Sequence, residues 1–342
     1  MKKIFYPWSF LLVFILTSCW WLNPKYSRGY FPAEVTNFEG LNTSYNDYNM
    51  DIRILFHDMD VIFSSDRNSI GERQFDLVGN QVSFSWDQEE GIFLAQVTPG
   101  FNFGEKLSTR LAEATHTVYN ERGPYTFGEP EKGSHLLFSR DDQGYFTVYA
   151  KAFQIPYNVS TIQKIEQGEE SFRILSENAN EMYPCLYGKS FTKEYLLGSR
   201  NKPEKLILST DQEGKFNIYE IDLPEDGDVM GFLRNGGLKT GKKMSVNSIA
   251  NDQAPYVSKS RMVFASDRSG GYGGYDLYFS DFDGKNWSQP QNFGPEMNSE
   301  FDEFRPIIDS APYFENSVMI FSSNRPGGLG GFDLYYVGIP KF

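Results

Sequence analysis

The sequence predicts an all-β chain that closes into a β-propeller of five blades, on three observations. An acidic residue, followed three positions later by proline or once by methionine, precedes an apolar segment five times along the chain. Two further short apolar strands follow each acid. After the N-terminal segment, no long stretch carries the 3.6-residue apolar period of a helix. Units of this kind cannot bury their apolar faces alone, so they are expected to stack around a ring.

The acid is the first landmark of each unit. The spacings between successive copies are 74, 60, 71 and 51 residues, so insertions vary while the unit persists. A similar polar lead, such as NTSYND at 42–47 and NSEFDE at 298–303, comes just before each acid. The five copies are Asp47, Glu121, Glu181, Asp252 and Glu303.

The second and third elements are hairpin strands. The second strands read VIFSSDR, LLFSRDD, LILSTDQ, MVFASDR and MIFSSNR, and the third begin FDLV at 75, FTVY at 146, FNIY at 216, YDLY at 275 and FDLY at 332. Apolar residues that alternate over four to six positions between turn residues are typical of β-hairpins. The segment 104–118 is the one place where a short helix is expected.

The fourth strand is best seen after residue 280, where a DFDG turn leads into KNWSQPQNFGPEM. The segment NFEGLNTSYND at 37–47 parallels NFGPEMNSEFDE at 292–303, and the last unit ends after its third strand. Residues near 30–40 are therefore predicted to supply the outer strand of the last blade and close the ring, which pairs otherwise exposed strand edges. Six blades are the alternative, because VSFSWDQEEGIFLAQV at 82–97 reads as one more strand pair.

Two glycine-rich loops, SGGYGGYDLY at 269–278 and PGGLGGFDLY at 326–335, join second and third strands. Neither has the spacing or the lysine of a phosphate-binding loop. The glycines are expected to take positive φ, and the aspartate of each loop to accept hydrogen bonds from loop amides. The residues concerned are Gly270, Gly271, Gly273, Gly274 and Asp276 in the first loop, and Gly327, Gly328, Gly330, Gly331 and Asp333 in the second.

The F-x-S-x-R strand, the glycine loop and Y-D-L-Y in residues 250–342 resemble the WD40-like PD40 repeat of TolB-like and Bacteroidota envelope propellers. Earlier units depart from it, since Thr147 and Asn217 replace the Asp of D-L-Y. The resemblance implies a non-catalytic scaffold whose partners are envelope or outer-membrane proteins, with roles in outer-membrane assembly, secretion or integrity.

The N-terminal segment MKKIFYPWSFLLVFILTSC has the layout of a secretory signal peptide. Its apolar run of about 12 residues is short for a bilayer span. Leu16-Thr17-Ser18-Cys19 resembles the lipobox of bacterial lipoproteins, which implies cleavage before a lipidated Cys19. The expected layout is a signal peptide at 1–18, a lipidated tether at 19–29 and a single propeller domain at 30–342. The expected location is the outer membrane, facing the periplasm, with the cell surface as the alternative.

Charge, residue spacing and motif content argue against several classes of function. The net charge of −13 argues against nucleic acid as a partner. If Cys19 carries lipid, Cys185 has no cysteine with which to form an internal disulfide. Three histidines without close spacing give no support to a zinc site, and DFDGKN at 281–286 lacks the closing Glu of a calcium loop. The chain has no G-x-S-x-G nucleophile elbow. No metal and no cofactor is therefore expected.

The five acids leave two interpretations open. Around one mouth of the central channel they would repel one another, shift upward in pKa and attract a cation or a basic segment. Alternatively, each accepts hydrogen bonds from amides at its own strand start. A glycan-binding or glycoside-hydrolase propeller using these acids is the alternative function; hydrolysis needs two carboxyl groups about 5–9.5 Å apart. Four aromatic residues are candidates either for partner contacts or for packing between blades: Tyr125, Phe127, Tyr272 and Trp287.

Overall fold

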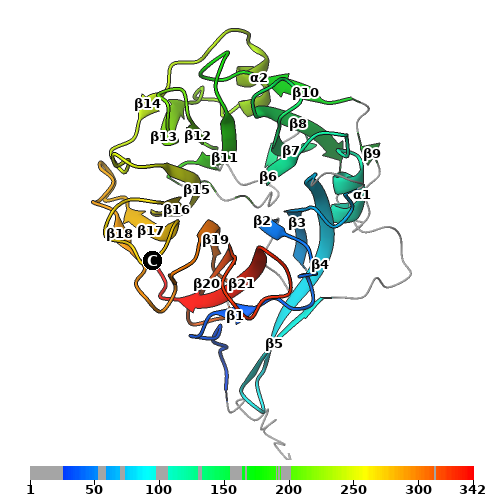
Figure 1. The fold of residues 1–342 in the computed structure, drawn as a ribbon, viewed down its shortest axis with the longest axis vertical. Helices are drawn as coiled ribbons and strands as arrows, with labels where there is room; N and C mark the ends of the chain where they lie inside the picture. Colours follow the sequence, from blue (N-terminus) through cyan, green and yellow to red (C-terminus); the bar gives the residue numbers. More distant parts are fainter. Residues whose placement is uncertain are drawn as a thin grey trace, which may run out of the picture.

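The computed structural model describes residues 26–52, 59–69, 74–97, 107–129, 133–154, 164–165, 168–189, 191, 193, 202–311 and 313–342. In this part of the chain, five antiparallel sheets stand around a central axis as the blades of a propeller (Figure 1). The predicted five-bladed fold is confirmed. The predicted signal peptide, Cys19 and the tether up to residue 25 lie outside the described residues and stay predictions, as does any role of His57.

Each blade begins with its innermost strand and continues outward. Blade one contains β2 (Asp47–Ile52), β3 (Met59–Ser65), β4 (Asp76–Asp87) and β5 (Ile92–Val97). Blade two contains β6 (Glu121–Glu129), β7 (Gly133–Arg140), β8 (Thr147–Gln154), β9 (Lys164–Ile165) and β10 (Glu170–Phe172). Blade three contains β11 (Glu181–Tyr187), β12 (Lys205–Thr210), β13 (Asn217–Asp222) and β14 (Lys242–Lys243). Blade four contains β15 (Asp252–Ser258), β16 (Arg261–Ser266), β17 (Asp276–Asp281) and β18 (Gln291–Asn292).

Blade five joins the two ends of the described chain. Its first three strands are β19 (Glu303–Asp309), β20 (Ser317–Ser323) and β21 (Asp333–Ile339), and the fourth is the N-terminal β1 (Thr36–Asn37). In the register of this pair, Thr36 lies opposite Tyr336. The Asn42 amide reinforces the closure, because it accepts from Leu334 N at 2.8 Å and donates to Leu334 O at 2.9 Å. The predicted closure by the N-terminal strand is confirmed.

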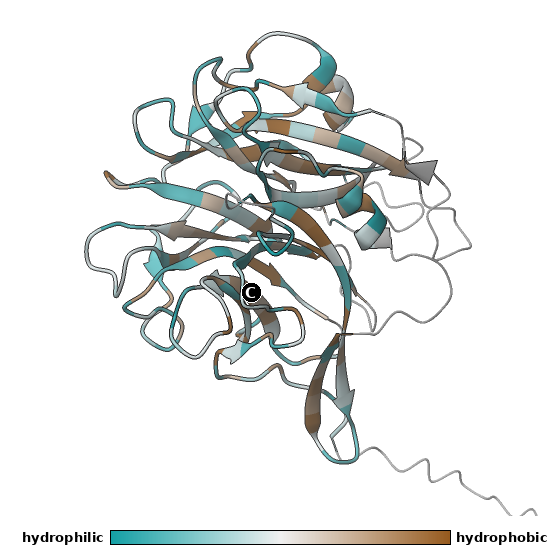
Figure 2. Cartoon of the chain, turned by 45° about the vertical axis from the view of Figure 1, so that its right-hand side comes forward, coloured by the Kyte–Doolittle hydropathy of each residue, from teal (hydrophilic) through white to brown (hydrophobic). Residues whose placement is uncertain are grey.

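The segment 82–97 does not start a sixth blade. It forms the outer half of β4 together with β5, and both strands belong to the sheet of blade one. The resulting hairpin projects from the ring near the N-terminal end (Figure 2). Trp86 lies near its tip and meets the Tyr26 ring edge to face, with the centroids 6.4 Å apart. The six-bladed alternative is therefore wrong: an extension of blade one accounts for the additional strand pair.

Two short helices lie outside the blades in the described residues. The first, α1 (Leu107–Glu113), falls within the segment where a helix is predicted. The second, α2 (Val229–Arg234), is not predicted, because six residues are too few to display a 3.6-residue period. Asp228 caps its N-terminus by accepting from Gly231 N at 2.8 Å. Neither described helix is long and apolar enough to span a bilayer.

The core fills the space between neighbouring blades, and the first and second strands of each blade are largely buried. Every side chain of β20 is buried, for example. Tyr125 and Phe127, predicted as surface contacts, are 1% and 3% exposed because they lie on the innermost strand of blade two. Trp287 is half-buried against the rings of Tyr187 and Phe282, whereas Tyr272 is exposed. The prediction of surface contacts is thus wrong for Tyr125 and Phe127.

Candidate functional site

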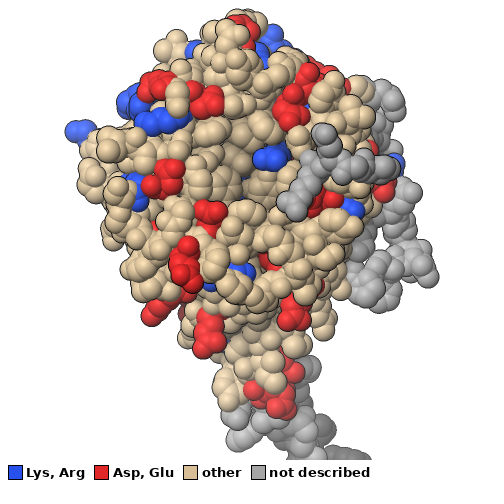
Figure 3. Space-filling model, viewed as in Figure 1, with Lys and Arg blue, Asp and Glu red and all other residues tan. Residues whose placement is uncertain are grey.

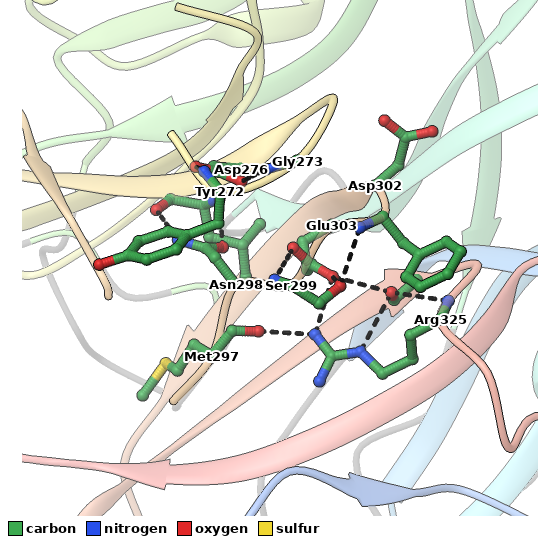
Figure 4. Close-up of polar contacts among 12 residues, drawn as sticks. Tyr272, Gly273, Asp276, Met297, Asn298, Ser299, Asp302, Glu303 and Arg325 are labelled. Atoms are coloured by element: carbon green, nitrogen blue, oxygen red, sulfur yellow. Dashed lines mark hydrogen bonds and ion pairs between the residues drawn. The ribbon is translucent and has the colours of Figure 1, made fainter. Parts of the chain in front are cut away.

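The five repeated acids point into their own blades, and each is fully buried. Figure 4 shows the arrangement in blade five, where the Glu303 carboxylate accepts from Ser299 N at 2.8 Å and Ser323 Oγ at 3.0 Å. Arg325 Nη2 donates to it at 2.9 Å and to Met297 O at 2.6 Å. Asp47 and Asp252 repeat this pattern with the equivalent serine and arginine residues of blades one and four. These contacts fix the turn before each innermost strand to the end of the second strand.

Blades two and three satisfy their acids differently. In blade two an arginine replaces the strand-end serine, and Arg140 Nε donates to Glu121 Oε1 at 2.8 Å. Glu121 Oε2 has no hydrogen-bond partner among the described residues, and burial raises the pKa of this carboxyl to about 7. In blade three, Glu181 accepts from the backbone N–H groups of Ile174 at 2.7 Å and Ser176 at 2.9 Å. Burial raises its pKa too, so desolvation rather than repulsion within a ring of carboxylates is the main cause of both shifts.

The residue before each acid joins neighbouring blades through what we call an inter-blade clamp. In blade three, Asn180 N and Nδ2 donate to Asp211 at 2.8 and 2.6 Å, and Asn180 Oδ1 accepts from Phe146 N of blade two at 2.9 Å. In blade five the two residue types are exchanged, since Asp302 N donates to Asn324 Oδ1 at 2.8 Å. The clamp residues of the five blades are Asn46 with Asp66, Asn120 with Asp141, Asn180 with Asp211, Asn251 with Asp267, and Asp302 with Asn324.

The glycine-rich loops pack against the next blade. In the first loop, Asp276 accepts from Tyr272 N at 2.7 Å and Gly273 N at 3.1 Å (Figure 4). A Cβ on Gly273 would lie only 2.1 Å from Phe301 O of blade five, so only glycine allows this approach.

The second loop makes the same contacts at the closure of the ring. Asp333 accepts from Leu329 N and Gly330 N, and a Cβ on Gly330 would lie 1.7 Å from Tyr45 O of blade one. Gly270 and Gly327 each have φ of +92°, as expected, whereas the other six loop glycines do not have positive φ. These loops therefore hold blades together, and their geometry gives no support to a phosphate cradle.

A cavity of about 570 Å³ opens on the central axis and is here called the mouth cavity. Residues at the starts of the first and third strands of all five blades line it, so it lies at one end of the channel. None of the five repeated acids belongs to this lining. Figure 3 shows acidic side chains spread over the face of the ring that it draws. The lining residues are Asn46, Tyr48, Phe75, Arg122, Phe146, Asn180, Met182, Tyr183, Phe216, Gln253, Tyr275, Asp302, Phe304 and Phe332.

A bulge in each innermost strand directs the side chains that follow the acid. The ladder to the second strand shifts register just after the acid in all five blades. The second residue after the acid has positive φ in every blade. These residues are Asn49 (61°), Gly123 (62°), Tyr183 (58°), Ala254 (55°) and Arg305 (48°). Bulges re-aim side chains, and left-handed non-glycine residues store strain that is often found at functional sites.

Sequence reasoning missed the mouth cavity, although a signal was present. The residue after each acid lines the cavity, and the aromatic residue that opens each third strand lines it too. The first set differs from blade to blade and consists of Tyr48, Arg122, Met182, Gln253 and Phe304. The second is aromatic in every blade and consists of Phe75, Phe146, Phe216, Tyr275 and Phe332. A ring of five aromatic residues at one level of a propeller could have been inferred from the repeat alignment.

Aromatic faces with a few polar groups give the mouth cavity its chemistry. Burial raises the pKa of the Tyr48 and Tyr183 hydroxyls, and that of Tyr275 to about 12, so all three are neutral hydrogen-bonding groups at pH 7. Asn180 and Gln253 add amides to the same lining. Apolar faces with convergent polar groups, in a volume of this order, are typical of small-ligand sites.

The described residues contain no cluster of His, Cys, Asp and Glu that could hold a metal ion. Cys185 is fully buried, and burial raises its thiol pKa to about 12, which keeps it protonated and inert at neutral pH. In the DFDGKN segment, Asp283 Oδ1 accepts from Lys285 N at 2.8 Å and Asn286 N at 2.7 Å, which makes it a hairpin turn.

The fold and the axial cavity together define a five-bladed β-propeller with a ligand-sized mouth. No protein-family model matches the chain. No curated protein matches it either.

Solved structures resemble the chain over most of its length. An α-L-arabinofuranosidase from Podospora anserina, solved in complex with cellotriose, is 9% identical, with 92% of this chain and 97% of that chain covered and a TM-score of 0.50. A protein solved as an RGII complex is 8% identical, with 94% of this protein and 94% of that one covered and a TM-score of 0.52. The endo-arabinase from Bacteroides thetaiotaomicron is 12% identical, with 91% and 99% covered and a TM-score of 0.49.

These findings correct the family and function predicted from the sequence. The assignment to the PD40 repeat family is wrong, because no family model supports it and the fold resembles that of a glycoside hydrolase, the arabinofuranosidase. The non-catalytic scaffold with envelope or outer-membrane proteins as partners is wrong for the same reason. The motifs behind the resemblance have structural roles here: Arg325 binds the Glu303 carboxylate within blade five, and Asp333 shapes the loop that enters blade one. At such low identity the likeness establishes the fold alone.

Proposed function

We propose that the protein binds a glycan chain in the mouth cavity. One observation carries the proposal: eight aromatic side chains line a cavity of about 570 Å³ on the axis of the ring. The faces of aromatic rings carry negative charge density and attract the polarised C–H groups of a sugar ring. The described lining therefore offers several stacking surfaces within the length of a short oligosaccharide.

Polar groups between the rings complete a carbohydrate site. A sugar hydroxyl both donates and accepts, so it needs amides and hydroxyls at the edge of the stacking surface. Gln253 supplies an amide, and Tyr48 and Tyr275 supply neutral hydroxyls. Similar folds include an arabinofuranosidase solved with cellotriose, which supports a glycan as the ligand of this cavity.

Hydrolysis has a further requirement. Glycoside cleavage by the usual route uses two carboxyl groups about 5–9.5 Å apart, one on each side of the scissile bond. Asp302 is the carboxyl group of the described lining, and its Oδ1 accepts from Tyr275 N at 2.8 Å. The proposal therefore concerns binding, and cleavage is measured on the same samples.

Calorimetric titration of the purified protein with cellotriose tests the proposal. Phe216→Ala removes one stacking face and is expected to weaken binding by about 5-fold, because stacking on one aromatic ring contributes on the order of 1 kcal/mol. Tyr272→Ala is the matched control, since Tyr272 is exposed and lies outside the lining. Cleavage is measured on the same samples as the release of reducing ends from arabinan. Equal binding by both variants and the native protein would place the sugar elsewhere.

A further inference from the structure

Arg122 is the cationic residue of the described mouth lining. It follows Glu121 at the start of β6, and its guanidinium carbon lies 4.5 Å from the centroid of Phe75 and 5.4 Å from that of Phe146. The Tyr48 ring is 5.6 Å away. Arg122 Nε is buried without a hydrogen-bond partner among the described residues. Three aromatic rings therefore hold the guanidinium while leaving its N–H donors uncommitted.

The other arginines near the blade starts are used differently. Arg67, Arg268 and Arg325 each donate to the repeated acid of their own blade. Arg140 pairs with both Glu121 and Glu169. Arg122 has no ion pair with any described carboxylate. A guanidinium remains charged at all accessible pH values, and its planar fork fits a carboxylate with two parallel hydrogen bonds.

The carboxylates around the mouth cavity already have partners. Asp302 lines the cavity opposite blade two, and its oxygens accept from Tyr275 N at 2.8 Å and Asn324 Nδ2 at 3.4 Å. The clamp aspartates of the other four blades each accept two hydrogen bonds from an asparagine. They are Asp66, Asp141, Asp211 and Asp267. None of them neutralises Arg122 by direct contact.

A second arginine adds positive charge near the axis. Arg305 is 1% exposed and donates to the backbone carbonyls of Pro124 at 3.3 Å and Pro255 at 3.1 Å. Its guanidinium carbon lies 5.3 Å from the centroid of Tyr183, which itself lines the mouth cavity. A buried cation bonded to neutral carbonyls keeps its full charge, so Arg122 and Arg305 both favour an anionic group on the ligand.

We propose that the mouth cavity selects an acidic glycan, and that the carboxylate of a uronic acid residue accepts hydrogen bonds from the guanidinium of Arg122. This inference rests on the proposed glycan binding and adds the class of sugar. The sugar ring stacks on the aromatic faces that Arg122 does not cover, such as Phe216 and Tyr275. A neutral sugar of the same shape makes the stacking contacts but leaves the guanidinium without an anion.

Three trisaccharides titrated into the purified native protein separate the possibilities. Trigalacturonate carries the carboxylates, its methyl ester has the same rings without charge, and cellotriose is a neutral sugar of another stereochemistry. Trigalacturonate is expected to bind about 10- to 100-fold more tightly than the ester, as for other charge-assisted bidentate hydrogen bonds. The difference should shrink as sodium chloride is raised.

Substitutions assign the preference to one side chain. Arg122→Met should abolish the preference for trigalacturonate over the ester, and Arg122→Lys should retain part of it because the charge remains without the planar fork. Lys242→Met is the charge-matched control, since Lys242 lies outside the mouth lining and its side chain is 81% exposed. If the melting curve shows that Arg122→Met does not fold, the affinities of the native protein and of Arg122→Lys for trigalacturonate and its ester test the proposal.

The outcomes distinguish the two proposals. Equal affinity for trigalacturonate and its ester overturns the acidic-glycan inference and leaves glycan binding in place. An acid preference that survives Arg122→Met also overturns it, because another cation is then responsible. Failure of all three sugars to bind rejects the proposed function itself.

Discussion

Each of the five repeated acids lies buried at the start of its blade's innermost strand, but the hydrogen-bond partners of the carboxylate differ between blades. The carboxylates of Asp47, Asp252 and Glu303 each accept hydrogen bonds from a serine at the end of the second strand and from an arginine. The Glu181 carboxylate accepts hydrogen bonds from backbone N–H groups instead. Glu121 is the least satisfied, since one of its carboxylate oxygens has no partner in the described chain. The sequence could place these acids, because they recur at the same point of every unit. It could not reveal which of them titrates near neutral pH, because that depends on burial.

A pH-dependent stability follows for Glu121. Its pKa rises to about 7 in the folded protein, above the value of about 4.3 of an unfolded chain, so the folded state binds more protons between these values. Stability attributable to this group is full below about pH 4.3 and is lost as pH rises through about 7, by about 4 kcal/mol in total. Glu121→Gln removes the titration.

Urea unfolding at pH 5 and pH 8 provides the check. Relative to Glu121→Gln, the native protein is expected to lose about 3 kcal/mol of unfolding free energy between the two pH values. A constant difference between the two proteins at both pH values would contradict the assignment.

At the scale of elements, the interlocking loops and clamps explain why blades of different length form one ring. Each glycine loop enters the first turn of the next blade, and the loop of blade five enters blade one. The closure thus combines the short β1–β21 pairing with a close backbone approach between Gly330 and Tyr45.

Gly330→Ala tests this approach. The new Cβ would lie 1.7 Å from Tyr45 O, so the loop must move, at a cost of about 2–3 kcal/mol in unfolding free energy. Gly236→Ala is the matched control, because a Cβ there meets no atom within 4 Å and its φ is not positive. Thermal melts of the two variants give the comparison. Equal melting temperatures would show that the loop does not lock the ring.

The elements could be predicted where their signal is local and repeated. Strand pairs and turn glycines recur in each unit, so the fold and the closure by residues 36–37 follow from pattern alone. The helix α2 and the extension of β4 into the hairpin with β5 occur once, and no repeat identifies them. The mouth cavity depends on bulges that turn Tyr48 and Arg122 toward the axis, and hydrogen bonding between strands, not residue type, sets that direction.

At the scale of the whole molecule, the ring brings together side chains that are far apart in the sequence. Tyr48 of blade one and Phe304 of blade five lie in one lining although each unit contributes only a few positions. The residue after each acid differs from blade to blade, whereas the clamps and the aromatic residue before each third strand are nearly the same in every blade. The mouth cavity, where we place the glycan, thus combines a repeated set of aromatic rings with a set of side chains that varies between blades.

A crystal structure of the purified protein soaked with cellotriose tests glycan binding at the axis most directly. We predict electron density for a sugar in the mouth cavity, stacked on one of the aromatic residues that open the third strands, such as Phe216 or Tyr275. Sugar density only outside this cavity, for instance beside Trp287 between blades three and four, would contradict the proposed site.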